Sequence, residues 1–99
     1  MKFAEKLYFG KQAEKEKKEI LKNLRSGRKQ IGVYVVCAAA NNSDLLDIIP
    51  SLIINERISD RMKVAGIAVS RREAVEVCRD IVMDCYAQTA GYDIRSFIC

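Results

Sequence analysis

The chain has 99 residues, of which 49% are hydrophobic, and its formal net charge is +4. This length predicts a single domain with one modest core, and the apolar content excludes an intrinsically disordered chain. The absence of histidine excludes Ser-His-Asp and Cys-His catalysis, histidine-ligated zinc and histidine pH switches. No apolar run approaches the roughly 20 residues of a membrane-spanning helix, and the N-terminus lacks a secretory signal, so a cytoplasmic protein is expected.

The first thirty residues are expected to hold one helix and one element of undecided type. Residues 1–10 are short and rich in aromatic side chains, and their pattern fits either a short helix or a short edge strand. Residues 12–26 contain helix formers without Pro or Gly, and Gly27 fits the position just past the helix end. The apolar stripe of this predicted helix is narrow and consists of Ala13, Ile20, Leu21 and Leu24.

The middle of the chain is predicted to hold a buried strand and a helix. Residues 30–40 are a nearly unbroken apolar run, which indicates a central strand covered on both faces, because a half-exposed strand alternates polar and apolar residues. Residues 41–44 offer several helix N-caps. Residues 45–57 place aliphatic side chains at helical spacing, and Pro50 is expected either to kink this helix or to start a second one. Residues 59–61 are predicted as a loop.

The last third begins with a second buried strand, predicted over residues 63–69. Ser70 followed by Glu73 matches a capping box, in which each side chain satisfies a backbone N–H group at the start of a helix. The helix that follows is predicted to reach Thr89, and its broad apolar face is typical of packing on a sheet. Residues 92–98 are predicted as a last strand.

Strands that alternate with helices predict parallel pairing and right-handed crossovers. The favoured fold is therefore a single α/β domain over residues 1–99, with a small three-to-four-stranded, mainly parallel sheet covered by helices. The alternative takes residues 5–9 as a true first strand and gives a ferredoxin-like α+β fold, with residues 41–61 inserted between the middle strands.

Polar side chains follow both predicted central strands. If these strands are parallel neighbours, their C-terminal ends meet at one crevice, where ligands settle in parallel α/β sheets. A helix N-terminus adds unpaired N–H groups and partial positive charge. The pattern predicts a small-molecule phosphate or nucleotide site that consists of Asn42, Ser43, Ser70, Arg71 and Arg72. The competing interpretation is that Ser70 only caps the helix, since no glycine-rich phosphate motif is present.

Residues 1–30 carry a net charge of +6 and the rest of the chain a net charge of −2. On the first predicted helix, basic residues recur every three or four positions and line one face: Lys11, Lys15, Lys18, Lys22 and Arg25. Such a face binds nucleic-acid phosphates or an acidic protein. Interrupting glutamates and the absence of interleaved aromatic residues favour a merely solvated face instead.

Two carboxylate pairs are candidates for acid–base chemistry. Asp44 and Asp47 follow the first buried strand, whereas Asp80 and Asp84 lie on the polar face of the last helix. Catalytic pairs need a cleft that perturbs their pKa values, and neither pair indicates one. No catalytic residue is therefore assigned, and an enzyme is not favoured.

The four cysteines show no CxxC spacing. Cys78 and Cys85 lie about 10.5 Å apart along the predicted helix, which is too far for a disulfide. Small buried apolar thiols in a reducing compartment are the favoured interpretation, and we expect neither a metal site nor a cofactor.

Residues 45–54, LLDIIPSLII, contain more large aliphatic side chains than one face of a short helix needs. Ile53, Ile54 and Ile58 are expected to leave an exposed apolar patch, and such patches often mark partner surfaces. The prediction is a homodimer. The alternative is that these side chains complete a small core.

Four stretches, LYFG, IGVYVVCAA, VAGIAVSRREAVE and AGYDIRSFI, resemble a group of short hypothetical proteins from anaerobic Gram-positive bacteria. The resemblance covers most of the chain and implies a bacterial cytoplasmic origin, but it implies no activity and no site. The residue patterns themselves favour a binding or interaction module without catalytic activity.

Overall fold

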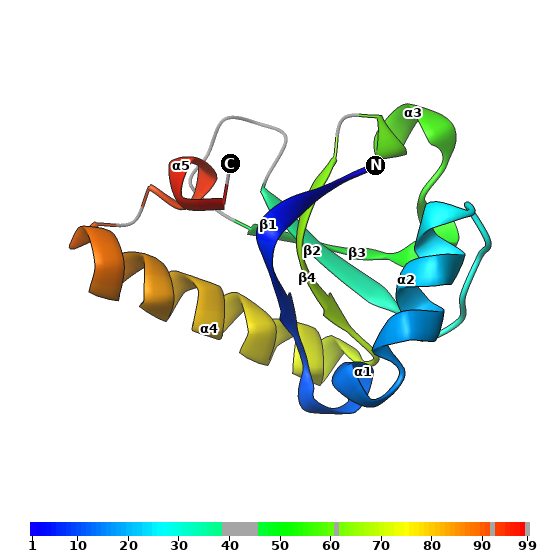
Figure 1. Cartoon of the computed structure of the whole chain (residues 1–99), viewed down its shortest axis with the longest axis horizontal. Coiled ribbons are helices and arrows are strands. Elements are labelled where there is room, and N and C mark those ends of the chain that lie inside the picture. The colour runs from blue at the N-terminus through cyan, green and yellow to red at the C-terminus, as the bar shows by residue number, and fades with distance from the viewer. Residues whose placement is uncertain (39–45, 61, 92, 99) are drawn as a thin grey trace.

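The computed structural model describes residues 1–38, 46–60, 62–91 and 93–98 (Figure 1). No helix in these ranges is long and apolar enough to span a membrane. The elements are β1 (Lys2–Phe9), α1 (Lys11–Lys15), α2 (Lys17–Arg25), β2 (Tyr34–Ala38), β3 (Leu46–Pro50), the 3₁₀ turn η1 (Ser51–Ile53), α3 (Glu56–Ser59), β4 (Lys63–Ala68), α4 (Arg71–Thr89) and α5 (Ile94–Ile98).

The four strands form one mixed sheet in the order β1-β4-β2-β3. β4 pairs in parallel with β1 and antiparallel with β2, and β3 pairs antiparallel with β2. The α/β class therefore holds, but the mainly parallel sheet is wrong, and so is parallel pairing of the two central strands. Parallel neighbours need a crossover of about a dozen residues or more, and only residues 39–45 separate β2 from β3.

The helix predicted over residues 45–57 is also wrong, because its first half is the strand β3. Ile48 and Ile49 are β-branched and pair with Val36 and Val35 of β2. Pro50 ends the strand, where its missing N–H group costs no ladder bond. Only η1 and the four-residue α3 follow, and α3 includes part of the loop predicted over residues 59–61; residue 61 lies outside the described ranges.

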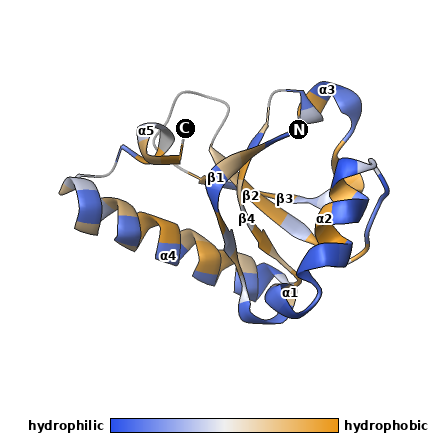
Figure 2. Ribbon diagram, viewed as in Figure 1, coloured by the Kyte–Doolittle hydropathy of each residue, from blue (hydrophilic) through white to orange (hydrophobic). Residues whose placement is uncertain are grey.

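The sheet is covered on both faces, as predicted for residues 30–40. α4 and α5 lie on one side and α1 and α2 on the other (Figure 1), and α4 turns its apolar side toward the strands (Figure 2). Along β2, Val36 faces the α4 side and Val35 faces the α2 side, and both are fully buried. β2 and β4 are the two inner strands, so both predicted central strands occupy the positions assigned to them.

The C-terminal segment is the helix α5, and the strand predicted over residues 92–98 is wrong. Ile94 and Ile98 are buried and Phe97 is partly buried against the α4 core. These three positions follow the i, i+3, i+4 spacing of a helix, which explains how a one-turn element covers the sheet. The last strand of a ferredoxin-like fold is absent from the described ranges, although β1 is the first strand which that alternative required.

The single helix predicted over residues 12–26 is divided into α1 and α2 at Glu16, whose φ of −117° and ψ of 22° interrupt the helix. Ala13 of α1 is fully buried near the start of α4, whereas Ile20 and Leu24 of α2 pack on the sheet. Both halves bury these side chains in the same core cluster on this face of the sheet, and Ala13 also donates its N–H to Glu73 of α4. The predicted stop is confirmed, because Gly27 has a left-handed φ of 76° just after the C-cap of α2.

Candidate functional site

The geometric reason for the predicted anion site does not hold in this sheet. Because β2 and β4 are antiparallel, the C-terminal end of β2 lies beside the start of β4, and Ser70 follows the opposite end of that strand. Asn42 and Ser43 lie outside the described residues. Arg71 and Arg72 are exposed on the first turn of α4. No shared crevice between parallel strand ends therefore supports a phosphate site.

Glu73 instead joins the starts of two helices. Its backbone N–H donates to Ser70 Oγ at 3.1 Å, which confirms the Ser70 half of the capping box. Its carboxylate is almost fully buried and accepts N–H bonds from Val69 at 3.1 Å, Gln12 at 3.0 Å and Ala13 at 3.1 Å. Those last two groups are unsatisfied donors at the N-terminus of α1. Glu73 is therefore a structural capping residue for both α1 and α4.

Gly10 makes this contact sterically feasible. A Cβ atom at Gly10 would lie 2.0 to 2.1 Å from carbon and oxygen atoms of the Glu73 side chain. The two residues are far apart in the sequence and belong to no common motif. Reasoning from the sequence assigned Glu73 only a local role, and no periodic signal pointed to its contact with Gly10.

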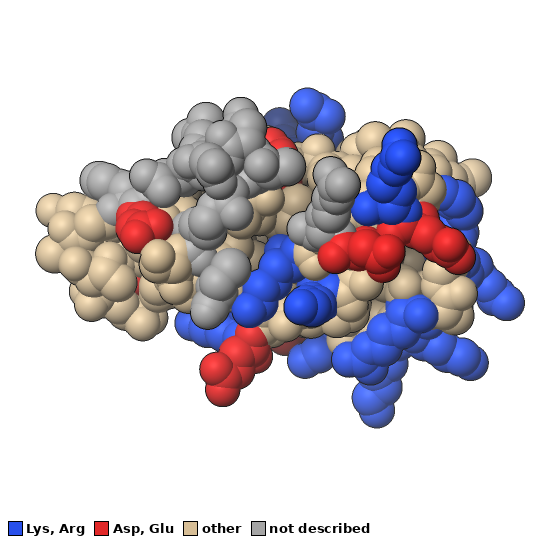
Figure 3. Space-filling model, turned by 90° about the horizontal axis from the view of Figure 1, so that it is seen from above, with Lys and Arg blue, Asp and Glu red and all other residues tan. Residues whose placement is uncertain are grey.

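The predicted basic residues are all exposed, but they do not form one helical face, because Lys11 and Lys15 belong to α1 while the others belong to α2. Figure 3 shows Lys and Arg gathered over the half of the molecule that holds α2 and α3, with acidic side chains among them. Lys17 lies 5.1 Å from the centre of the Phe9 ring, and Arg25 lies 5.5 Å from the centre of a second β1 ring, that of Phe3. Part of the basic surface therefore packs on β1.

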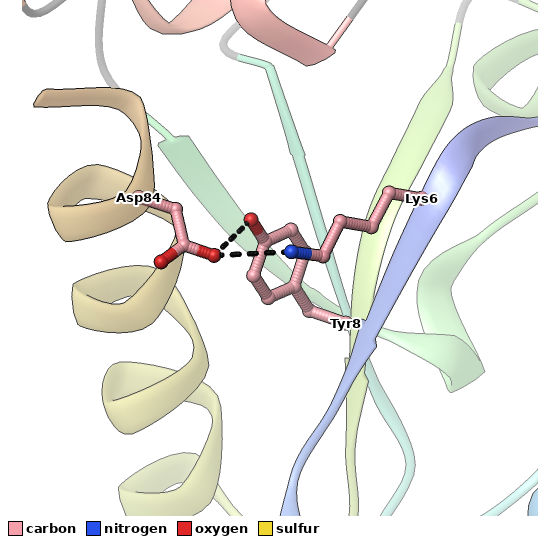
Figure 4. A network of polar contacts seen from close by, with 3 residues as sticks. All are labelled: Lys6, Tyr8 and Asp84. Atoms are coloured by element: carbon pink, nitrogen blue, oxygen red, sulfur yellow. Dashed lines mark hydrogen bonds and ion pairs between the residues drawn. The ribbon is translucent and has the colours of Figure 1, made fainter. Parts of the chain in front are cut away.

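A three-residue polar network joins β1 to α4 (Figure 4). Tyr8 Oη donates to Asp84 Oδ2 at 2.6 Å, and Lys6 Nζ lies 3.3 Å from the same oxygen. Burial, followed by the hydrogen bond to Asp84, raises the pKa of Tyr8 well above its ordinary value. The bonds from Tyr8 and Lys6 lower the pKa of Asp84. Both groups therefore titrate away from neutrality, so this network is suited to holding β1 against α4 and not to proton transfer near pH 7.

The other carboxylates considered for catalysis do not converge. Asp80 is exposed on α4, Asp47 is exposed on β3, and Asp44 lies outside the described residues. Within the described ranges, no group of three or more Cys, Asp or Glu side chains is arranged to hold a metal ion. Burial raises the pKa of Cys37 to about 11 and also raises that of Cys78, so neither is a ready thiolate.

A cavity of about 470 Å³ lies between the end of α2 and α3. Leu24 and Ile54 contribute apolar lining, while Arg28, Glu56 and Asp60 contribute charges of both signs. These opposed charges match neither a simple anion nor a simple cation, so no ligand is assigned to the cavity.

The outer edge of β3 is the feature that carries interaction chemistry. The Ser51 N–H donates to the Val33 carbonyl of β2 at 2.8 Å, which makes this a hydrogen-bonded pair. Hydrogen-bonded and non-bonded pairs alternate along an antiparallel ladder, so Leu46, Ile48 and Pro50 turn their backbone groups away from β2. In the part of the chain that the structure describes, no other strand pairs with this edge.

The flank of α4 beside β3 is apolar. The opposite flank faces β1, because Asp84 bonds to Tyr8 there, and Ile81 at the centre is fully buried. Steps of 100° per residue then place four apolar side chains on the β3 side, between exposed Arg71 in the first turn and exposed Thr89 in the last. These residues are Val75, Cys78, Val82 and Tyr86, of which the first and last are 56% and 52% exposed. This flank and the outer edge of Leu46–Pro50 together are called the β3 surface below.

Further exposed aliphatic side chains lie where β3 ends. Ile31, Leu52 and Ile53 are 88%, 46% and 58% exposed. They are neighbours because Lys29 donates to the carbonyls of Leu52 and Ile54, and Val33 bonds to Ser51. Of the patch predicted from the sequence, Ile53 is exposed, while Ile54 and Ile58 pack partly against the core.

The chain was compared with protein-family models, curated proteins and solved structures, and none of them matches it. The resemblance to short proteins of Gram-positive bacteria therefore stays a prediction, and the functional argument rests on the geometry of the chain itself.

Proposed function

We propose that the protein is an interaction module that binds a second copy of itself through the β3 surface. The observation that supports the proposal is the outer edge of β3, which turns backbone N–H and C=O groups outward beside an apolar helix flank. An edge of this kind accepts another strand through main-chain hydrogen bonds. Burial of the adjacent apolar side chains adds a favourable hydrophobic term.

The chemistry of the surface favours a second copy over a charged ligand. Asp47 is the only charged residue between positions 46 and 54, so an acidic or basic partner finds little to pair with there. Two copies of the same apolar surface, in contrast, exclude water from each other. On the face drawn in Figure 3, Lys and Arg gather over the half of the molecule that holds α2 and α3.

The salt dependence of assembly distinguishes this proposal from binding through the basic residues. Each copy carries a net charge of +4, so two copies repel at long range and added salt strengthens the dimer by screening that repulsion. A nucleic acid or acidic protein bound to α1 and α2 responds in the opposite sense and is released by salt.

The direct test measures mass against concentration by sedimentation equilibrium, with two matched variants of α4. Val75→Lys places a charge on the β3 surface, and Met83→Lys places one on the outer side of the same helix, where Met83 is similarly exposed at 61%. We expect the wild-type chain and Met83→Lys to dimerise alike, and Val75→Lys to weaken the dimer by about tenfold or more. A wild-type chain that stays monomeric from micromolar to millimolar concentration contradicts the proposal, as does an equal effect of the two variants.

A further inference from the structure

We infer that the two copies pair β3 with β3, antiparallel and about a two-fold axis beside Ile48. The inference rests on the proposed self-association and names the partner segment and its register. Two four-stranded sheets then become one continuous sheet, with α4 of each copy on the same face.

The hydrogen-bonding groups of β3 complement themselves in this register. Ile48 turns both its N–H and its C=O outward, so it exchanges two bonds with Ile48 of the partner subunit. The Leu46 N–H donates to the carbonyl of the partner's Pro50, and the symmetric bond forms on the other side of the axis. Pro50 has no N–H group, so each Leu46–Pro50 pair forms only one of its two possible bonds, and the Leu46 carbonyl gains no strand partner.

The neighbouring registers are less favourable. Moving the axis to Asp47 sets two aspartates directly opposite each other, and like charges at opposed positions destabilise a strand pair. Moving it to Ile49 sets Leu46 against Leu52, which belongs to the 3₁₀ turn η1 and not to an extended strand. With the axis at Ile48, Asp47 faces the partner's Ile49, and the whole strand is used.

The same axis brings the apolar helix flanks together. Leu46 and Ile48 pack on the α4 side of the sheet, in the same layer as Cys78 and Val82 of the β3 surface. Across the axis this flank meets its own copy. The strand pair thus fixes the relative orientation of the two copies, and the helix flanks supply the apolar contact area that a short strand alone lacks.

Disulfide trapping tests the register. Asp47→Cys and Ile49→Cys are made as separate chains, each in a background with Cys37→Ala, Cys78→Ser and Cys99→Ser, because Cys37 lies directly opposite position 47 within the same chain. The background chain alone is the control for residual native thiols. Opposed residues in a non-hydrogen-bonded antiparallel pair have Cα atoms about 4.5 Å apart, which a disulfide spans. We expect a covalent dimer mainly when the two variants are mixed and oxidised, joining one chain of each kind, with either variant alone remaining largely uncrosslinked.

The other outcomes overturn the inference in separable ways. A dominant self-disulfide of Asp47→Cys or of Ile49→Cys places the axis at that residue. Dimers seen by sedimentation without any crosslink remove β3 as the partner segment, while self-association itself stands. A wild-type chain that never dimerises removes the proposed function and the register together, whereas failure of the background alone assigns the loss to its cysteine substitutions. Circular dichroism of each variant establishes that it is folded before oxidation.

Discussion

The two edges of the sheet are built differently. β1 is an irregular edge, since its run from Phe3 to Tyr8 faces only the run from Val64 to Gly66 on β4. Charged residues such as Lys6 interrupt it, and α4 is bonded to it through Asp84. β3 pairs regularly with β2, is flanked by an apolar helix side and carries one charge.

Bulges and lysines are the devices by which proteins prevent edge strands from recruiting other chains. The β1 edge has both, whereas the β3 edge has only a single aspartate and a terminal proline. The difference indicates that the chain is protected against pairing at β1 and left available for pairing at β3. Four measurements test this contrast, from the largest expected effect to the smallest.

Removing the buried carboxylate should have the largest effect, on the β1 side. Glu73→Ala leaves the N–H groups of Gln12, Ala13 and Val69 without their partner, and the Ala13 group is buried. We expect the free energy of unfolding to fall by about 3 kcal/mol or more. Denaturant titration measures it, and the exposed Glu76→Ala on the same helix should change it by less than about 0.5 kcal/mol. Equal losses in both variants would show that Glu73 is not the shared cap of α1 and α4.

Hydrogen exchange compares the two edges directly. In the dimer, the amides of Leu46 and Ile48 are bonded, so their exchange should slow about tenfold once nine-tenths of the chains are paired. No amide of β1 should depend on protein concentration. Exchange rates measured at two concentrations check both statements, and concentration-dependent protection of β1 would reverse the assignment of the two edges.

Tyr8→Phe removes the hydrogen bond from β1 to α4 and should lower stability by about 1 kcal/mol. The pH profile identifies the cause. The folded state holds the Tyr8 proton more tightly than the unfolded chain, whose tyrosine pKa is about 10. The contribution of Tyr8 is therefore complete below pH 10 and is lost as the pH rises beyond it. Thermal unfolding at alkaline pH should show a shallower loss for Tyr8→Phe than for the wild-type chain.

Lys6→Gln should have the smallest effect on the free energy of unfolding, smaller than that of Tyr8→Phe, because both partners of its ion pair with Asp84 are substantially exposed. The Asp84 pKa is lowered in the folded state, so its contribution is present above the unfolded value near 3.8 and is lost as the pH falls below it. NMR titration should show a higher Asp84 pKa in Lys6→Gln than in the wild-type chain, and a higher one still in Tyr8→Phe. The reverse order would mean that Lys6, and not Tyr8, dominates the network.

Local sequence patterns correctly predicted the two inner strands and the long helix α4. β4 and β2 are covered on both faces, so their unbroken apolar runs clearly indicate strands. α4 has an N-cap at Ser70, and its helical spacing of apolar residues continues over several turns. Residues 45–57 were misassigned because a dense aliphatic run fits both helical and strand spacing. Residues 92–98 were misassigned although their three apolar positions already matched a helical turn.

Longer-range features were less accessible to reasoning from the sequence. Strand direction depends on which connections cross the sheet, and this follows from whole-chain packing. The contact between Gly10 and Glu73 leaves no periodic trace, because it joins distant positions. The excess of aliphatic residues around β3 is visible in the sequence, but the structure places residues 46–50 on a strand edge and not on the helix face first expected.

The pairing of β1 with β4 has a consequence for synthesis of the chain. Among the described strands, the first to leave the ribosome hydrogen-bonds only to the last, and the carboxylate that caps α1 arrives later still. The N-terminal third therefore waits, unpaired and lysine-rich, until most of the polypeptide has emerged. Contacts so distant in sequence slow the search for the native topology. The sheet can therefore close only after β4 has emerged, and truncated nascent chains that lack β4 should leave β1 and α1 protease-sensitive.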